Sequence, residues 1–323
     1  MQRNLLRLLG VAFAAALLGS GVAHAQNFPS KSIRMILPFP PGGPTDALGR
    51  IVAQALSDLV GQPVVADNRP GAGGNLGLEL AAKSPPDGYT IVLSSPIISL
   101  APSLYNKLGY DPKDLAPVGM MGGVNNVFVV HPSVPARTLK EFVALARSRP
   151  GKLNYGSGGV GTTTHLAPEM LKSMAKINLV HVPYKGSGLA AVALASGEVD
   201  MLVATVAAVL PLIQAGKIRP LAVLAPHRLS TLPNVPTSKE AGFDGYEVLV
   251  WYGLLTPAAT PRDVVTKLNA DVNKVLSLPT TKEKLAQLDF QAMPSTPDEF
   301  AAFIKSEAAR YAKVVSEAGI PKQ

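Results

Sequence analysis

Two glycine-rich stretches have the residue types and spacing to bind an anion through backbone amides. They are PFPPGGPTDALGR, residues 38–50, and YGSGGVGTTTHLAPEML, residues 155–171. Each pattern predicts the end of a strand, a glycine turn and the start of a helix. Because the N–H groups and the dipole of a helix N-terminus attract negative charge, we expect an anion-binding helix end in each stretch.

The second stretch also matches the spacing of a dinucleotide-binding fingerprint. Gly156, Gly158 and Gly161 follow the pattern G-x-G-x-x-G. That fingerprint needs an acidic residue about 20 positions further along to bind a ribose hydroxyl. Residues 176–186 read KINLVHVPYKG and contain no acid. We therefore predict an anion site that takes no nucleotide, and no cofactor.

Hydroxyl groups beside the two glycine turns could complete the anion site. A small organic acid would be bound by backbone amides and by Thr45, Ser157, Thr162 and Thr163. The alternative is that the glycines only permit tight turns, and for one loop alone this interpretation is favoured. Two equivalent loops in one chain reverse the preference, and we expect them to face each other.

Three ionisable residues leave alternatives open. Asp46 beside an anion site either stabilises the first turn of its helix, or orients the loop or accepts a hydrogen bond from a ligand amine or water. Asp200, in the apolar run SGEVDMLVAT, either caps a backbone group or faces the ligand. His165 is the one histidine near the second loop, where a structural role is favoured over a ligand contact or a general base.

Familiar catalytic and metal-binding patterns are missing from the sequence. There is no G-x-S-x-G elbow, no phosphate-binding G-x-x-x-x-G-K-[ST] loop and no cysteine. His131, His165, His181 and His227 lack metal-ligand spacing. We expect no catalytic residue and no metal. The aromatic pair at 251–252 could stack on a ligand or pack at a hinge.

The N-terminal segment has the three parts of a secretory signal peptide. Arg3 and Arg7 precede the apolar run LLGVAFAAALLGSGVA, and Ala23-His24-Ala25 gives a small-x-small cleavage site. We predict cleavage after Ala25 and export to a bacterial periplasm, where a chain without cysteine needs a large core.

Charge and composition disfavour a nucleic-acid partner. Removing the signal leaves 28 Lys and Arg against 22 Asp and Glu, a net charge of about +6. The basic residues are scattered, and aromatic residues make up 6% of the chain. Nucleic-acid binding favours a basic stripe with stacking aromatics, so we expect none.

Strand-like runs alternate with helical patterns, which predicts an α/β fold with mainly parallel sheets. Residues 32–39 form the first predicted strand, and a helix follows from Thr45. Capping pairs or Thr-Pro steps predict further helix starts at Thr138, Thr237, Thr260 and Thr296.

Two long extended runs, at 118–132 and 247–257, predict two crossings between lobes. One lobe would be discontinuous, formed by residues 26–125 plus 249–323, and the other would comprise residues 126–248. The ligand would then bind in the cleft, at the carboxyl ends of the strands.

Five blocks along nearly the whole mature chain resemble the substrate-binding proteins of tripartite tricarboxylate transporters, the Bug receptors. The blocks are PFPPGGPTDALGRIVAQAL, VVADNRPGAGGNLG, LNYGSGGVGTTTHLAPEML, VPYKGSGLAAVALASGEVDML and RLSTLPNVPTSKEAG. The resemblance implies a two-lobed periplasmic-binding-protein fold of type II, a Venus flytrap that closes about a hinge. It also implies a receptor that delivers carboxylates to a tripartite permease.

The resemblance further implies that the loops Pro41–Asp46 and Ser157–His165 hold one carboxylate with ordered waters. The first loop has PPGG where the family more often has an alanine-bearing version. The far end of the ligand would meet Ser94, Ser95, Tyr184, Lys185 or Thr205. The full set of expected contacts is Pro41, Gly42, Gly43, Thr45, Asp46, Ser94, Ser95, Ser157, Gly158, Gly159, Gly161, Thr162, Thr163, His165, Tyr184, Lys185, Asp200 and Thr205.

We therefore predict a monomeric periplasmic receptor for a di-, tri- or aromatic carboxylate that performs no chemistry. One alternative is a ligand-sensing module for a membrane sensor kinase. The other, less favoured, is an enzyme acting on an acidic substrate, with His165 as base and Asp46 or Asp200 assisting. The sequence does not choose among a C4 dicarboxylate, citrate, an amino acid, nicotinate and an aromatic diacid.

Overall fold

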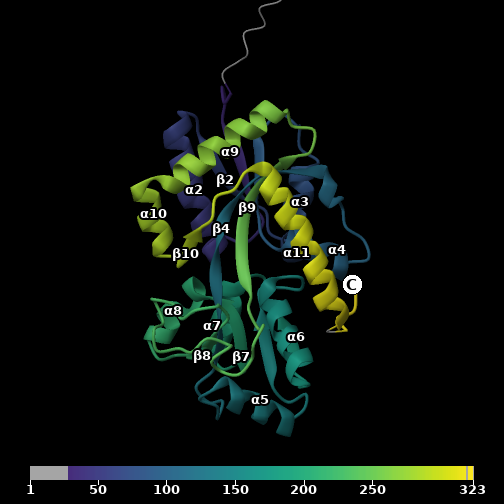
Figure 1. Cartoon of the computed structure of the whole chain (residues 1–323), viewed down its shortest axis with the longest axis vertical. Helices are drawn as coiled ribbons and strands as arrows, with labels where there is room; N and C mark the ends of the chain where they lie inside the picture. Colours follow the sequence, from purple (N-terminus) through teal and green to yellow (C-terminus); the bar gives the residue numbers. More distant parts are fainter. Residues whose placement is uncertain (1–27, 318, 323) are drawn as a thin grey trace, which may run out of the picture.

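The computed structural model describes residues 28–317 and 319–322 and shows an α/β fold with two lobes (Figure 1). The predicted signal peptide, residues 1–25, lies outside the described residues. Two long strands, β4 and β9, run from one lobe into the other (Figure 1). We use "first lobe" for the half that contains β1–β3, β10, α2–α4 and α9–α11, and "second lobe" for the half that contains β5–β8 and α5–α8.

The described residues form one ten-stranded sheet. Eight strands follow the hydrogen-bonded order β2-β1-β3-β9-β4-β7-β5-β6, and β10 and β8 each pair with β4 off this path. Their bounds are β1 Ile33–Leu37, β2 Val64–Asn68, β3 Thr90–Ser94, β4 Leu115–Val130, β5 Asn154–Ser157, β6 Val180–Pro183, β7 Met201–Thr205, β8 Arg219–Val223, β9 Leu249–Pro257 and β10 Phe290–Ala292.

Strand β4 changes partners at one point between the lobes. Leu115 to Asn125 pair antiparallel with β9, whereas Asn126 to Val130 pair antiparallel with β7. The side-chain Nδ2 of Asn126 donates to the Val248 carbonyl at 2.9 Å, just before β9 begins. Both predicted crossings are confirmed as strands, and they lie side by side at this point.

The sheet is mixed, whereas the sequence predicted mainly parallel pairing. Pairs β1–β2, β1–β3, β5–β6 and β5–β7 are parallel. The strands β4 and β9 pair antiparallel with their neighbours because they traverse the molecule in opposite directions. The parallel pattern therefore holds inside each lobe and fails at the crossings.

Ten α-helices cover the described sheet. Their bounds are α2 Pro44–Val60, α3 Asn75–Ala82, α4 Ile97–Leu104, α5 Leu139–Ser148, α6 Thr163–Ala175, α7 Ser187–Ala195, α8 Val206–Gln214, α9 Arg262–Ser277, α10 Pro279–Ala286 and α11 Pro297–Glu317. Short 3₁₀ turns occupy Ala72–Gly74 and Pro112–Asp114. No helix within the described residues combines the length and apolar character needed to cross a membrane.

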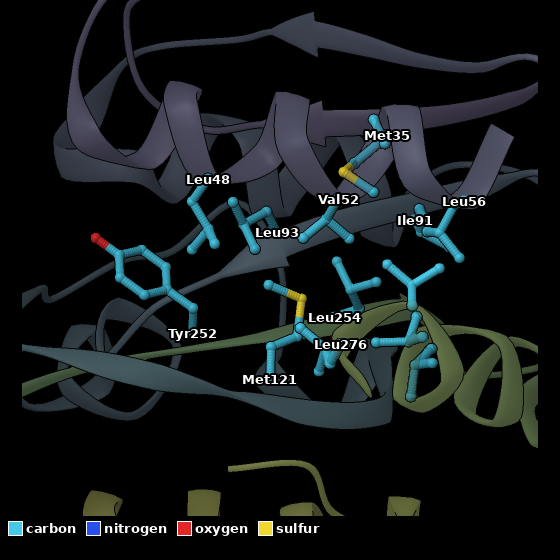
Figure 2. Packing of buried hydrophobic residues seen from close by; sticks show 14 of the residues in the cluster. Met35, Leu48, Val52, Leu56, Ile91, Leu93, Met121, Tyr252, Leu254 and Leu276 are labelled. Atoms are coloured by element: carbon cyan, nitrogen blue, oxygen red, sulfur yellow. The ribbon is translucent and has the colours of Figure 1, made fainter. Parts of the chain in front are cut away.

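The apolar face of α2 is buried in the core of the first lobe. Leu48, Val52 and Leu56 pack against strand residues that include Met35 and Leu254 (Figure 2). Tyr252 lies at one edge of this cluster, and its hydroxyl points away from the other labelled side chains (Figure 2). This packing holds α2 against the sheet, with the N-terminus of the helix shortly after the end of β1.

One predicted helix start is wrong. Thr237 and Glu240 do exchange the two expected capping hydrogen bonds, at 2.8 and 3.1 Å, but only a turn follows. Gly242 and Gly245 have φ of +87° and +75°, so the chain leaves the helical region after a single turn. The starts expected near Thr138, Thr260 and Thr296 precede helices α5, α9 and α11.

A small apolar cluster joins the lobes beside the crossing strands. Leu100 and Leu104 of α4, Leu166 of α6, and Tyr311 and Val315 of α11 are all buried in it. Helix α11 extends from the first lobe down beside α6 (Figure 1). The lobes therefore touch through side chains as well as through β4 and β9.

Candidate functional site

A cavity of about 450 Å³ lies between the lobes. Both predicted loops contribute to its wall, together with the starts of α4, α7 and α8. The lining residues are Phe39, Pro40, Pro41, Gly42, Gly43, Pro44, Thr45, Gly73, Ser95, Pro96, Ile97, Gly158, Thr162, Thr163, Thr164, Lys185, Gly186, Ser187, Gly188, Leu189, Val192, Thr205, Val250 and Tyr252.

The first loop presents the N-terminus of α2 to this cavity. Gly43 is the N-cap and Pro44 the first helical residue, so Ala47 makes the first helical hydrogen bond, to the Gly43 carbonyl. Among the described residues, the N–H groups of Thr45 and Asp46 have no acceptor. Two backbone donors and the positive end of a 17-residue helix therefore face the anion site.

Asp46 orients the first loop and does not line the cavity. Its carboxylate accepts hydrogen bonds from Gly42 N at 3.0 Å, Arg50 Nε at 2.9 Å and Asn68 Nδ2 at 2.9 Å. Burial raises the pKa of Asp46, but these bonds outweigh burial and hold the pKa below its ordinary value. Of the roles left open by the sequence, the structure supports loop orientation, with the charge balanced by Arg50.

The second loop presents the N-terminus of α6. Thr162 is the N-cap, and the N–H groups of Thr163 and Thr164 have no acceptor within the described chain. The Gly158 amide instead donates to Thr164 Oγ1 at 2.8 Å, and the Gly159 amide donates to Ser157 Oγ at 3.1 Å. The glycine amides therefore hold the turn, while the first-turn amides remain open to a ligand.

Gly158 is also needed for close packing. A Cβ atom at this position would lie 2.9 Å from Ser187 N and 3.3 Å from the Gly186 carbonyl carbon. The start of α7 therefore rests against the second loop. This contact adds a third helix N-terminus to the cavity, with open N–H groups at Ser187 and Gly188 in the described structure.

A stack of three rings supports the second loop from below. Tyr155 and His181 lie opposite each other in the β5–β6 pairing, with ring centroids 4.8 Å apart. The His165 ring stacks on His181 at 4.2 Å. His181 Nε2 and Ser157 Oγ are hydrogen bonded at 2.6 Å, which ties the stack to the turn.

The stack keeps both imidazoles neutral. Burial lowers the pKa of His165, and burial together with His165 and Lys172 lowers the pKa of His181 to about 3. Glu169 nearby forms an ion pair with Lys172, and it also accepts a hydrogen bond from the Tyr155 hydroxyl. His165 does not line the cavity, so the structure supports the structural role for it.

Several other predicted contacts do line the cavity: Pro41, Gly42, Gly43, Ser95, Lys185 and Thr205. Thr205 is the N-cap of α8, and its Oγ1 is buried without a partner in the described residues. Gly159 and Gly161 do not line it, and neither do Ser94 and Tyr184. The Tyr184 hydroxyl donates to Glu198 at 2.7 Å, and Ser94 Oγ is buried against the Ser95 carbonyl.

The expected ligand contact by Asp200 is not supported. Asp200 precedes β7 and Thr205 ends it, so about 16 Å of strand separates Asp200 from the cavity. Its carboxylate accepts from Asn154 N at 2.7 Å, while its own N–H donates to Asn154 Oδ1 at 2.8 Å. Asp200 therefore caps a backbone group, which was the other alternative.

The two aromatic residues of the return crossing have different roles. Trp251 is fully buried, packs edge-to-face on Phe300 and donates to Glu307 at 3.2 Å. Tyr252 forms part of the cavity wall, with its hydroxyl 3.3 Å from Thr45 Oγ1. Because successive strand residues face opposite sides, only Tyr252 reaches the cavity.

The lobes also meet at the cavity rim. The Tyr105 hydroxyl of the first lobe donates to the Val160 carbonyl in the second loop at 3.1 Å. A Cβ atom on Gly73 would lie 2.4 Å from the same carbonyl oxygen, so this approach needs a glycine. The described conformation therefore holds the second loop close to the first lobe.

Sequence reasoning missed the wall that α7 supplies. Gly186 has φ of +117° and caps this helix, and Leu189 and Val192 lie on its cavity side. The signal was present in the block VPYKGSG, where a glycine precedes an apolar helical run. The starts of α4 and α8 were predicted only through Ser95 and Thr205, which do line the cavity.

Comparison with known proteins agrees with this arrangement. A family model described as "Tripartite tricarboxylate transporter family receptor" matches residues 48–320. The chain is 38% identical over 324 residues to protein BugT of Bordetella pertussis, and the match covers 98% of each.

Two similar proteins have solved structures that include an organic acid. Rpa4515 of Rhodopseudomonas palustris, in a structure with adipate, is 36% identical with a TM-score of 0.88, covering 92% of this chain and 100% of that one. MatC of the same organism, with bound malate, is 30% identical with a TM-score of 0.84, covering 89% and 100%.

Proposed function

Because the chain belongs to the tripartite tricarboxylate transporter receptor family, we propose that it is a periplasmic receptor which delivers a small carboxylate to a tripartite permease. The carboxylate binds in the cavity between the two lobes. Structures of relatives with adipate and with malate support an organic acid as the ligand. The permease recognises the receptor with its lobes closed on the ligand.

The observation that carries this proposal is the convergence of three helix N-termini on one cavity. Helices α2, α6 and α7 each direct open backbone N–H groups there. Together with the Thr45 and Thr163 hydroxyls they suit a carboxylate, because charge-assisted hydrogen bonds are strong without an arginine. Lys185 is the one charged side chain among the lining residues of the described structure.

The expected contact residues then divide into two groups. Those that line the cavity contact the ligand or its ordered waters: Pro41, Gly42, Gly43, Thr45, Ser95, Gly158, Thr162, Thr163, Lys185 and Thr205. Of the others, Asp46 and Ser157 support the two loops through hydrogen bonds and His165 through packing.

The lobes comprise residues 26–125 plus 249–323 and residues 126–248 in this proposal. The four larger apolar clusters each draw their buried residues from one of these ranges. Strands β4 and β9 would bend where Asn125 pairs with Leu249. Closure would exclude water from the cavity and thereby strengthen each hydrogen bond to the carboxylate.

Binding without chemistry fits the side chains at the site. The Ser–His contact between Ser157 and His181 lies beneath the loop, and Ser157 is fully buried. A nucleophile must reach its substrate, and this hydroxyl is also engaged by the Gly159 amide. Relatives described as periplasmic binding proteins point to the same role.

Calorimetric titration of residues 26–323 with mono-, di- and tricarboxylates tests the proposal. Thr45→Val and Thr163→Val should each weaken binding by about 1–3 kcal/mol, since each removes a hydroxyl from the anion site. Thr266→Val, at an exposed site on α9, is the matched control and should leave affinity unchanged. Equal affinity in all four proteins would mean that the hydroxyls do not contact the ligand.

A further inference from the structure

The wall that α7 presents to the cavity is apolar and exposed. Leu189 and Val192 lie three residues apart on this helix, so they share a face, and they are 56% and 64% exposed. Both line the cavity between the lobes. Most side chains of their size and type are buried here, so this pair marks a surface that something covers.

The facing wall is apolar as well. Ile97 at the start of α4, Val250 on β9 and Phe39 after β1 line the same cavity from the first lobe or the crossing strand. Hydrogen-bonding groups line the same cavity at the helix N-termini and at the Lys185 and Thr205 side chains. The cavity therefore combines donors for an acid group with a large apolar lining.

Resting on the proposed carboxylate receptor, the geometry points to a ligand whose body is hydrocarbon, an unsubstituted aliphatic chain or an aromatic ring. Each methylene group buried against Leu189, Val192 and Ile97 should tighten binding about fourfold. A hydroxyl group in the same place would lose its water without gaining a partner from these side chains. The apolar walls therefore disfavour hydroxylated acids, because these walls contact the body of the ligand and not its carboxylate.

The test compares adipate with galactarate, which has the same six-carbon chain and two carboxylates but four added hydroxyls. Titration of residues 26–323 should show adipate binding at least about tenfold more tightly. Succinate against tartrate and benzoate against citrate extend the comparison to other lengths and to a ring.

Val192→Thr tests whether α7 disfavours hydroxylated acids, because it replaces one methyl group by a hydroxyl of similar size. It should weaken adipate about fourfold and leave galactarate unchanged or slightly improved. Val180→Thr, an equally conservative change at an exposed position outside the cavity lining, should alter neither.

The outcomes separate this inference from the function on which it rests. Preferred binding of hydroxylated acids, or unchanged adipate affinity in Val192→Thr, overturns the hydrocarbon body while the receptor stands. Failure of every carboxylate in these pairs to bind contradicts the receptor and the inference together.

Discussion

The two anion loops share one backbone plan but are held in place by opposite chemistry. The first is held by an ionised carboxylate, since Asp46 gathers Gly42, Arg50 and Asn68 around it. The second is held by neutral groups, in which Ser157 joins the turn to a buried imidazole stack.

This difference shows how a receptor can bind an anion with little fixed charge at its site. In the first loop the Asp46 carboxylate forms an ion pair with Arg50, and Asp46 does not line the cavity. In the second loop the pKa values of both histidines are lowered, so the support stays uncharged at neutral pH. In the proposed site the ligand would meet helix N-termini, and the groups that position them would not compete for its charge.

The largest effect is expected in the second loop from Gly158→Val. The new side chain would collide with the start of α7, 2.9 Å from the added Cβ, and displace one of the three helix ends. Carboxylate affinity should fall by about 100-fold or more, with the far-ultraviolet circular dichroism spectrum retained.

Ala144→Val, at an exposed position on α5 of the same lobe and outside the cavity lining, supplies the control for this substitution. It introduces the same side chain and should bind the carboxylate normally. Native affinity in Gly158→Val would show that the loop and α7 need not be in contact for binding.

Removing the ionic support of the first loop should have the next largest effect. Asp46→Ala leaves the Gly42 amide and the Asn68 side chain without their shared acceptor. We expect affinity to fall about tenfold, near 1.4 kcal/mol, measured by calorimetry at neutral pH. Asp58→Ala, an exposed acid on the same helix, should bind normally; an equal loss in both would point to general weakening of α2.

A smaller loss is expected from the neutral support of the second loop. His181→Phe keeps a ring in the stack but removes the 2.6 Å hydrogen bond to Ser157. The expected cost is about 1 kcal/mol in ligand affinity. His227→Phe, at an exposed position away from the cavity, is the control. Full affinity in His181→Phe would mean that the stack does not position the turn.

The pH dependence of stability should distinguish the support of the first loop by Asp46 from the support of the second loop by His181. His181 has a pKa of about 3 when folded and 6.5 ordinarily, so between these values the unfolded chain binds a proton that the folded chain does not. The free energy of unfolding should therefore decrease as pH falls from 6.5, by up to about 1.4 kcal/mol per pH unit. The pKa of Asp46 is lowered from 3.8, so its contribution is lost only below that pH.

Urea unfolding at pH 7, 5.5, 4.5 and 3.5 measures these windows. His181→Phe should reduce the slope between pH 6.5 and 4. Asp46→Ala should lower the free energy of unfolding at pH 7, 5.5 and 4.5, and by less at pH 3.5. The same slope in wild type and His181→Phe would contradict a neutral His181.

Local patterns predicted the loops well because their chemistry is contiguous in sequence. Glycines, a capping residue and a helical run identify the starts of α2 and α6 without any tertiary information. The family resemblance supplied the fold class, and the two crossings were visible as unusually long extended runs.

Residues that act across the sheet could not be found in this way. His181 meets Tyr155 only because β5 and β6 pair in register, and 26 positions separate them. Asp200 failed as a site residue because strand direction decides which end of β7 reaches the cavity. The roles of Tyr252 and α7 likewise depend on how two lobes meet, which no local periodicity encodes.

An NMR titration of ¹⁵N-labelled residues 26–323 with adipate, malate, citrate and benzoate tests whether the helix N-termini bind the carboxylate. We expect saturable binding of at least one acid, with the largest downfield amide shifts at Thr45, Asp46, Thr163 and Thr164. Saturable binding that leaves these four amides unmoved, or no binding of any of the four acids, would contradict it.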